Sequence, residues 1–332
     1  MISKIPIYNS LNTLIANKLT AQDLQVEVSY LIENFLVKNS LNIIFAKAGQ
    51  GKSWLMLALS LSLLKSGRIS QCIYMDMDNS KAALKNRKID ELIESYPNLV
   101  YVHSSKINQS SKDILYNLSK QAKENENCFE NMLFIFDSIR DFLGGSDMNS
   151  DRDILPLMAQ LKDLREAGAT VIFLHHTTKD SDGQQFKGST SFIDSVDVAY
   201  SLASNRNDNI LSYQLMVHKD RLSVENNAFE LNTQTMELTS ENFQFSSMSD
   251  NEVSFVKSVQ EYLETVGSSG IKQSQLLDNI GKSSDDKTAR KYLQKFAGDL
   301  WTSEKRAKEN NATYYFSISL PNIPNLPDPM VA

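Results

Sequence analysis

The sequence predicts an α/β fold in which a mostly parallel sheet carries helices on both faces, followed by a small second domain. Short apolar runs alternate with longer helical stretches between residues 41 and about 202, and such runs are typical of buried parallel strands. The first run is joined to its helix by the glycine-containing loop "AKAGQGKS". Beyond residue 252, three helical stretches precede the pattern "WTSEKRAKENNATYYFSI", which indicates a separate unit with a hairpin.

Composition limits the class of protein. With 332 residues, 41% apolar and 22% charged, the chain is long enough for one large core and a smaller one. The net charge of −6 argues against a uniformly basic nucleic-acid coat and allows local basic patches. Two cysteines are too few for a disulfide framework, and the most apolar run, "LMLALSLSLL", is too short to cross a bilayer. No signal peptide is apparent either, so we expect a cytoplasmic protein without a membrane partner.

The elements are expected in the following order. Residues 1–40 are predicted to form an N-terminal helical segment, because "LNTLIANKL" and "VSYLIENFL" carry apolar residues at helical spacing. The main domain spans 41–240, and its last part alternates like antiparallel strands at a sheet edge. A polar linker at 241–251, a second domain at 252–318 and a disordered, proline-rich tail at 319–332 complete the chain. The apolar strands expected in the main domain are "LNIIFA", "CIYMDM", "LVYVH", "MLFIF" and "TVIFLHH".

The loop at residues 46–53 has the signature of a phosphate-binding loop between a strand and a helix. Glycines let successive backbone N–H groups point at phosphate oxygens at a helix N-terminus, where the helix dipole favours an anion. Lys52 is expected to reach the β- and γ-phosphates of ATP, and the Ser53 hydroxyl to hold Mg²⁺. Alanine at the first position of the motif is a tolerated variation, since that position mainly shapes the turn. The expected nucleotide-binding residues are Ala46, Lys47, Ala48, Gly49, Gln50, Gly51, Lys52, Ser53 and Trp54.

A buried strand that ends in an aspartate supplies a second element. "MLFIFD" ends in Asp137, and a carboxylate there can bind Mg²⁺ through water, as in enzymes of phosphoryl transfer. Asp76 and Asp78 stand at another strand end, in "YMDMD", and side-chain alternation predicts that they point the same way. Of these carboxylates, Asp137 is the candidate metal ligand, together with the Ser53 hydroxyl.

These motifs, in this order, resemble the RepA-like branch of the RecA/DnaB superfamily of P-loop ATPases, of the AAA_25 type. The similarity extends over about residues 30 to 240 and rests on the P-loop helix "AKAGQGKSWLMLALSLSLLKSG" and four further stretches. Those stretches are "IFDSIRDFLGGSDMNSDRD", "VIFLHHTTKD", "KGSTSFIDSVDVAYSL" and "MVHKDR". The resemblance implies a RecA-like core over residues 41–240, ATP and Mg²⁺ as cofactors, and a homo-oligomer such as a hexameric ring.

The resemblance also implies roles for individual residues. Asp78 corresponds to the carboxylate that activates the attacking water, although the family usually has glutamate there. His176 corresponds to a sensor of the γ-phosphate, with His175 a buried neighbour; a structural histidine is the alternative for either. Lys219 and Arg221 correspond to a pair that enters the neighbouring subunit's site, and an arginine supplied in this way is worth about 10³–10⁵ in rate. A solvated basic pair at a strand end is the alternative.

The resemblance places single-stranded DNA at the loop "TTKDSDGQQFKGST", residues 177–190. Lys179 and Lys187 are the phosphate contacts expected there. A flexible loop without a ligand is the alternative.

The second domain resembles a winged helix. Basic side chains of "TARKYLQKFAGDLW" and the residue before it fall within about 140° on a helix, with apolar residues opposite. Between residues 281 and 308 eight side chains are basic and four acidic. A partner-binding or purely structural domain is the alternative to DNA binding. The expected DNA contacts are Lys287, Arg290, Lys291 and Lys295 on the helix, and Lys305, Arg306 and Lys308 in the wing.

Taken together, the sequence predicts an ATP-hydrolysing, DNA-binding helicase, translocase or replication ATPase of the kind common on mobile elements. A ParA- or MinD-like partition ATPase is one alternative, because Lys47 falls where that class has a signature lysine. A KaiC-like nucleotide switch with little hydrolysis is the other, because Asp78 replaces glutamate.

Overall fold

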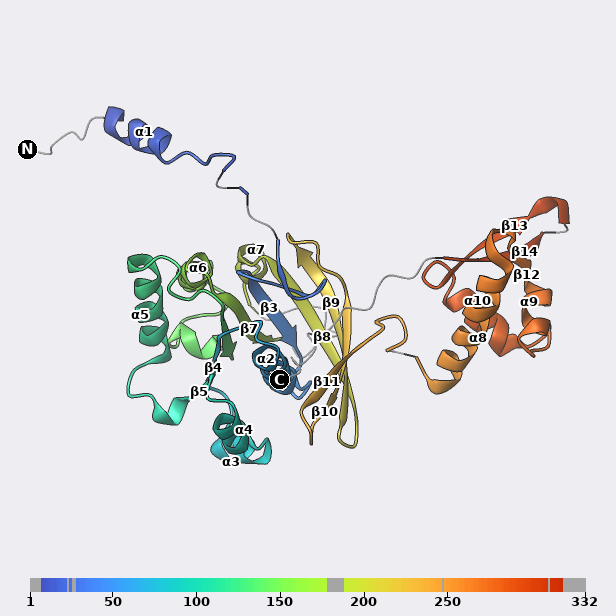
Figure 1. Ribbon diagram of the computed structural model, residues 1–332, viewed down its shortest axis with the longest axis horizontal. Coiled ribbons are helices and arrows are strands. Elements are labelled where there is room, and N and C mark those ends of the chain that lie inside the picture. The colour runs from blue at the N-terminus through green and yellow to red at the C-terminus, as the bar shows by residue number, and fades with distance from the viewer. Residues whose placement is uncertain are drawn as a thin grey trace, which may run out of the picture.

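The computed structural model describes residues 7–22, 24–25, 28–177, 188–246, 248–309 and 311–318 (Figure 1). Its main feature is a nine-stranded sheet with the order β11-β10-β9-β8-β3-β7-β6-β4-β5. The strands from β8 to β5 in this order are parallel to one another, and β9, β10 and β11 are antiparallel. The predicted RecA-like α/β core, with a mostly parallel sheet and antiparallel edge strands, is therefore confirmed.

The elements of the first 240 residues have the following bounds: α1 Ile7–Ala16, β1 Tyr30–Ile32, β2 Leu36–Val37, β3 Leu41–Ala46, α2 Lys52–Lys65, β4 Gln71–Asp76, α3 Lys81–Asn86, α4 Ile89–Ser95, β5 Leu99–His103, α5 Ser111–Glu124, β6 Met132–Asp137, α6 Asp151–Glu166, β7 Thr170–His176, α7 Ser191–Ser195, β8 Val198–Asn207, β9 Ile210–Asp220, β10 Asn227–Asn232 and β11 Glu237–Glu241.

Two hydrophobic cores lie on the two faces of the sheet, because successive strand residues point to opposite faces. In β3, Ile44 and Ala46 pack in the cluster that contains α2, whereas Ile43 and Phe45 pack in the cluster that contains α5 and α6. Both faces are covered, so the strands carry continuous apolar runs. This burial fixes β3 at the centre of the sheet and thereby the place of the loop that follows it.

The expectation of helix over "VSYLIENFL" is wrong. Residues 30–37 form the hairpin β1–β2 instead, with Asn34 in the left-handed region at φ 54°. Apolar side chains of this stretch are buried on both sides of the turn, and Phe35 packs against the rings of Tyr200 and Phe229. Five apolar residues of the hairpin are buried and only Glu33 at its turn is exposed, and a short apolar run of this kind does not distinguish helix from strand. Helix α1 does lie in the segment predicted to be helical.

Strand β9 contains one extra residue near its end. Ala199 pairs with Lys219, but Tyr200 pairs with Val217, so His218 has no partner of its own in β8. Tyr213, Leu215 and Val217 all pack in the cluster around α2, whereas Lys219 reaches α7 on the other face of the sheet. This bulge therefore changes the face on which the following side chain emerges.

The C-terminal residues form a unit with its own hydrophobic cluster. Its three helices and three-stranded antiparallel sheet, of order β12-β14-β13, follow the chain order α8-β12-α9-α10-β13-β14. Ser249 and Glu252 make a reciprocal capping box at the start of α8. The bounds are α8 Asp250–Val266, β12 Ile271–Lys272, α9 Gln273–Asn279, α10 Lys287–Lys295, β13 Trp301–Arg306 and β14 Ala312–Ser317.

The segment predicted as a polar linker makes contacts with both the main domain and the C-terminal unit. Gln214 of β9 donates a hydrogen bond to Ser246 Oγ at 2.8 Å, and Gln244 donates one to the Asp299 carbonyl at 3.1 Å. Phe245 and Met248 pack on the C-terminal cluster. The predicted tail, 319–332, lies outside the described residues. Among the described helices, none is both long and apolar enough to cross a membrane.

Candidate nucleotide-binding site

The phosphate-binding loop follows β3 directly and leads into α2. Gly49 and Gly51 adopt φ values of 82° and 72°, a backbone region that glycine enters without steric cost. Ala46 is instead the last residue of a strand and is fully buried, with no positive φ. Alanine therefore meets no backbone conflict at the first position of the motif.

Lys52 lies at the start of α2, and 7% of its surface is exposed. Its Nζ donates to the carbonyls of Ala46 and Lys47 at 3.1 and 3.3 Å, so the ammonium group lies in the concave side of the loop. Burial lowers the pKa of Lys52 to about 8, although the charges of Asp137 and Asp78 act in the opposite direction. An anion at this site would restore the charged form.

Asp137, at the end of β6, is brought together with Ser53. Burial raises the pKa of Asp137 to about 6, the hydrogen bond from Ser53 opposes this rise, and the charge of Asp76 adds to it. The Tyr74 hydroxyl donates to Asp137 Oδ2 at 3.0 Å. A carboxylate and a serine hydroxyl beside the phosphate-binding loop are oxygen ligands of the kind that Mg²⁺ accepts. The residues present therefore fit the metal.

Asp76 and Asp78 do not point the same way, which corrects the expectation from alternation. Strand β4 ends at Asp76, and the Asp76 carboxylate is fully buried. It accepts hydrogen bonds from the backbone of Asp78 and Asn79, at 3.2 and 3.0 Å, and from the Tyr101 hydroxyl at 2.6 Å. Asp78 lies in the turn that follows, and 57% of its side chain is exposed. Asp76 thus holds the turn that presents Asp78.

The two histidines of β7 differ in environment. His175 is buried and packs against the ring of Phe192. His176 lies next to Ala46 in the sheet register, with Nδ1 3.4 Å from Lys52 Nζ and Nε2 3.9 Å from Asp78 Oδ2. Burial and the positive charge of Lys52 lower the pKa of His176. The structure therefore brings together Lys52, Ser53, Asp78, Asp137 and His176 at the carboxyl ends of four neighbouring strands.

Several polar residues at this site were missed by sequence reasoning. Asn79 bonds both oxygens of Asp76 and accepts a hydrogen bond from Arg87, whose guanidinium lies 5.8 Å from the centroid of the Trp54 ring. Tyr74 and Tyr101 stack at 4.9 Å beside the two carboxylates. The position of Tyr74, two residues before Asp76, was the one available signal.

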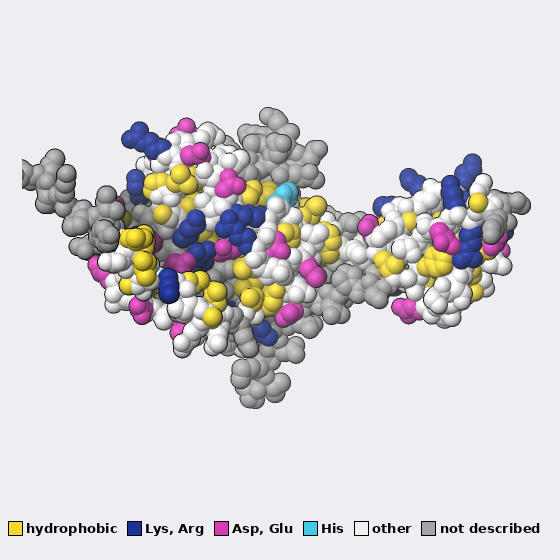
Figure 2. Space-filling model, turned by 90° about the horizontal axis from the view of Figure 1, so that it is seen from above, with side chains coloured by type: hydrophobic (Ala, Val, Ile, Leu, Met, Phe, Trp, Pro, Cys, Tyr) yellow, Lys and Arg dark blue, Asp and Glu magenta, His cyan; other side chains and the backbone are white. Residues whose placement is uncertain are grey.

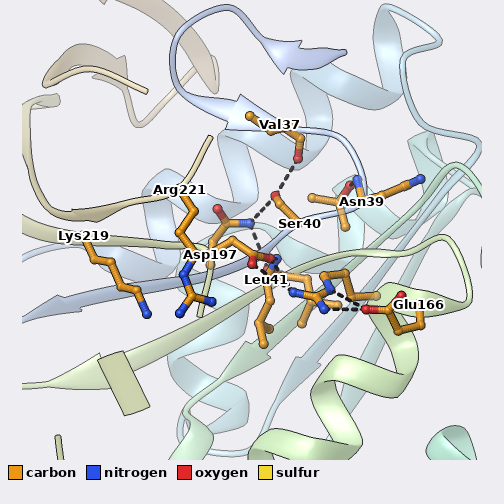
Figure 3. Close-up of polar contacts among 12 residues, drawn as sticks. Val37, Asn39, Ser40, Leu41, Glu166, Asp197, Lys219 and Arg221 are labelled. Atoms are coloured by element: carbon orange, nitrogen blue, oxygen red, sulfur yellow. Dashed lines mark hydrogen bonds and ion pairs between the residues drawn. The ribbon is translucent and has the colours of Figure 1, made fainter. Parts of the chain in front are cut away.

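Lys219 and Arg221 lie at the opposite end of the sheet. Strand β9 runs antiparallel to β8, so its end pairs with the start of β8, near Leu41. Lys219 Nζ donates to the carbonyls of Ile193 and Asp194 at 2.7 and 2.8 Å, and Arg221 reaches the Asp194 carbonyl at 3.4 Å. Figure 3 shows the two side chains extending in the same direction beside Asp197. They do not reach the chain's own Lys52.

Arg165 and Asp197 lie at the same end of the core as Lys219 and Arg221. Asp197 binds Arg165 through both carboxylate oxygens at 2.9 Å and also accepts from the Leu41 backbone at 2.9 Å, which fixes the start of β3 (Figure 3). Burial, with the charges of Arg221 and Lys162, lowers the pKa of Lys219. Lys and Arg side chains gather in the middle of the core face seen in Figure 2.

The predicted DNA contacts fall into three groups. Lys179 and Lys187 lie outside the described residues, as does the side chain of Lys308. Lys287, Lys291 and Lys305 are exposed. Arg290, Lys295 and Arg306 are exposed or half-buried and form ion pairs with Asp285, Glu252 and Glu304 at 3.1, 2.5 and 2.6 Å.

The helix that carries most of these residues is amphipathic, as predicted. Ala289, Leu293 and Phe296 are buried in the C-terminal cluster, and Tyr292 is half-buried there. The basic side chains are left on the outer side of α10. The arrangement agrees with the predicted helix faces.

The fold and this site together define a P-loop ATPase with a RecA-like core. The sequence profile of the AAA_25 family, described as an AAA domain, matches residues 11–182. The chain therefore belongs to that family. No curated protein matches the sequence. Among solved structures, the KaiC-like protein PH0186 of Pyrococcus horikoshii OT3 is similar at 12% identity and a TM-score of 0.44, over 65% of this chain and 100% of that one.

Proposed function

We propose that this protein is an ATP-hydrolysing DNA helicase, translocase or replication ATPase of the RepA kind, active as a ring such as a hexamer. ATP and Mg²⁺ are its cofactors in this proposal. Lys52 and the loop at 46–53 bind the phosphates, Ser53 and Asp137 hold the metal, and His176 contacts the γ-phosphate. Mg²⁺ neutralises charge on the phosphates when bound. Asp78, exposed beside His176, takes the proton of the attacking water.

One observation carries the proposal of an assembly. The phosphate-binding loop is at the carboxyl end of β3, whereas Lys219 and Arg221 are at its amino end. A second copy stacked head to tail would bring this basic pair to the neighbour's triphosphate. Such heterologous contacts generate rings when the rotation closes. With the described residues the exposed Arg221 side chain makes one long hydrogen bond, so it can leave its present contact at little cost.

The C-terminal unit supports the DNA part of the proposal. Its helices and three-stranded sheet follow the order of a winged helix, and Lys287 and Lys291 lie exposed on the outer side of α10. In this proposal α10 enters the major groove and the β13–β14 hairpin contacts phosphates. Lys179 and Lys187 contact a single strand.

Mixing two inactive variants tests the assembly. Lys52→Ala lacks a working phosphate site but keeps Arg221, and Arg221→Ala has the reverse defect. We expect each alone to lose hydrolysis by at least about 10³-fold, and their mixture to recover part of it through composite interfaces. Arg68→Ala is the matched control, because Arg68 is also exposed and bonds one backbone carbonyl, that of Tyr30, at 3.2 Å.

The results discriminate between the candidate functions. Full activity of Arg221→Ala, or a monomeric mass in the presence of ATP, would contradict the proposed assembly. Stimulation of hydrolysis by single-stranded DNA, with displacement of a paired strand, supports a helicase. ATP binding with little hydrolysis would instead favour a nucleotide switch, and dimers stimulated only by duplex DNA would favour a partition ATPase.

A further inference from the structure

The tip of the phosphate-binding loop is bonded to two side chains from distant strands. Ser204 of β8 donates its backbone N–H to Gln50 Oε1 at 2.7 Å, and its hydroxyl lies 2.9 Å from the Gln50 carbonyl. The hydroxyl of Tyr213 in β9 donates to the Gly51 carbonyl at 3.0 Å. Both contacts join residues more than 150 positions apart in the sequence.

Ser204 and Tyr213 act from a single place in the sheet. They are direct cross-strand partners in the β8–β9 register, so their side chains emerge on the same face. The Tyr213 side chain is fully buried, and burial raises its pKa far above neutral pH. Its hydroxyl therefore remains a hydrogen-bond donor at every working pH.

The loop needs such support because of its glycines. A glycine loses more conformational entropy on ordering than any other residue, and Gly49 and Gly51 both hold a positive φ. Gly51 also immediately precedes the first residue of α2, where the backbone N–H groups for phosphate begin. The fit is close, since a Cβ on Gly51 would lie 2.8 Å from the Tyr213 hydroxyl.

We infer that Ser204 and Tyr213 are positioning residues that hold the phosphate-binding loop in its nucleotide-binding shape before ATP arrives. The two hydroxyls bond the backbone carbonyls of Gln50 and Gly51, and the Ser204 backbone also bonds the Gln50 side chain. By fixing the loop in advance, the pair removes part of the ordering cost from the binding step. The inference rests on the proposed function only in that the loop binds a nucleoside triphosphate.

The test compares three hydroxyl deletions in the full-length chain. Tyr213→Phe removes the bond to Gly51 and keeps the ring. Tyr200→Phe is the matched control: Tyr200 is a buried tyrosine of β8 whose hydroxyl donates to the Phe35 carbonyl at 2.9 Å, away from the loop. Ser204→Ala provides a second, smaller change on the other strand. ATP dissociation constants, KM, kcat and the thermal midpoint are measured for all three.

We expect Tyr213→Phe to raise the Kd and KM for ATP about tenfold with kcat within twofold, as for a lost hydrogen bond of ordinary strength. Tyr200→Phe should lower the thermal midpoint about as much as Tyr213→Phe does, but it should leave the Kd for ATP within twofold. Ser204→Ala should raise the Kd about threefold. Unchanged ATP affinity in both Tyr213→Phe and Ser204→Ala would overturn the inference, whereas failure of the wild-type chain to bind ATP would overturn the proposed function.

Discussion

At the scale of single residues, the burial of Lys52 favours its neutral form before any phosphate is bound. Burial lowers its pKa to about 8, so above that pH a growing fraction of empty sites is neutral. A bound triphosphate stabilises the charged form, and binding is therefore linked to proton uptake. We expect the Kd for ATP to rise roughly tenfold between pH 7 and pH 9, measured by titration calorimetry.

The same experiment contains its control. Lys52→Arg keeps a positive charge throughout this range, so its weaker binding should change little with pH. Calorimetry at pH 8 in two buffers of different ionisation enthalpy should show net proton uptake by the wild-type protein. A wild-type affinity that is flat from pH 7 to pH 9 would show that Lys52 does not titrate in the empty site.

Sequence reasoning reached some residues of the site and not others, for a physical reason. Lys52 and Ser53 belong to a contiguous motif whose geometry is local, and Asp137 and His176 end buried strands. Tyr74, Tyr101 and Asn79 act through the adjacency of β4, β5 and β6 in the sheet. No local pattern in the sequence encodes which strands become neighbours.

At the scale of elements, the turn after β4 separates two aspartates that the sequence treats alike. Asp76 is fully buried and accepts hydrogen bonds from the turn and from Tyr101, whereas Asp78 is exposed. Asp76→Ala should lower the free energy of unfolding by about 2–4 kcal/mol, because buried donors lose their acceptor. Asp78→Ala should change it by less than about 0.5 kcal/mol and yet abolish hydrolysis. Denaturant unfolding and steady-state hydrolysis measure the two effects.

The reverse pattern, a stable Asp76→Ala protein and an unstable Asp78→Ala protein, would contradict these roles. Asn is the informative second substitution at position 76. It keeps one oxygen acceptor for the backbone of Asn79 and should lose less stability than Ala.

Elements also differ in how far the sequence determines them. The parallel strands are evident because both faces are buried and helices separate them. The β1–β2 hairpin cannot be recognised from the sequence in this way, because its apolar side chains fit a helical spacing as well as a buried turn. The difference is decided by tertiary contacts such as that of Phe35 with Tyr200 and Phe229, which lie far along the chain.

At the scale of the whole molecule, an acidic chain has a basic surface on its C-terminal unit. The net charge is −6, yet Lys287 and Lys291 are exposed on α10 and form no ion pair with the described residues. If α10 binds DNA, Lys287→Ala combined with Lys291→Ala should weaken binding and lower the slope of log affinity against log salt by about 2. Fluorescence anisotropy at several salt concentrations measures both quantities.

Lys295→Ala offers the contrast within the same helix. Lys295 is paired with Glu252 of the α8 capping box at 2.5 Å, so its removal should affect the stability of the unit more than the salt slope. An unchanged salt slope in the Lys287→Ala, Lys291→Ala protein would assign the basic side of α10 a role other than DNA binding.

The extra residue in β9 has a consequence for how this chain can vary. Tyr213 and Lys219 lie six positions apart in one strand, yet His218 places them on opposite faces of the sheet. In a regular strand six positions would put both side chains on one face, whereas deletion of His218 would leave five positions and keep Tyr213 on Gly51 and the lysine beside α7. Loss of the bulged residue is thus compatible with both contacts, whereas one residue added or removed between Tyr213 and Val217 would put either Tyr213 or Lys219 on the wrong face of the sheet.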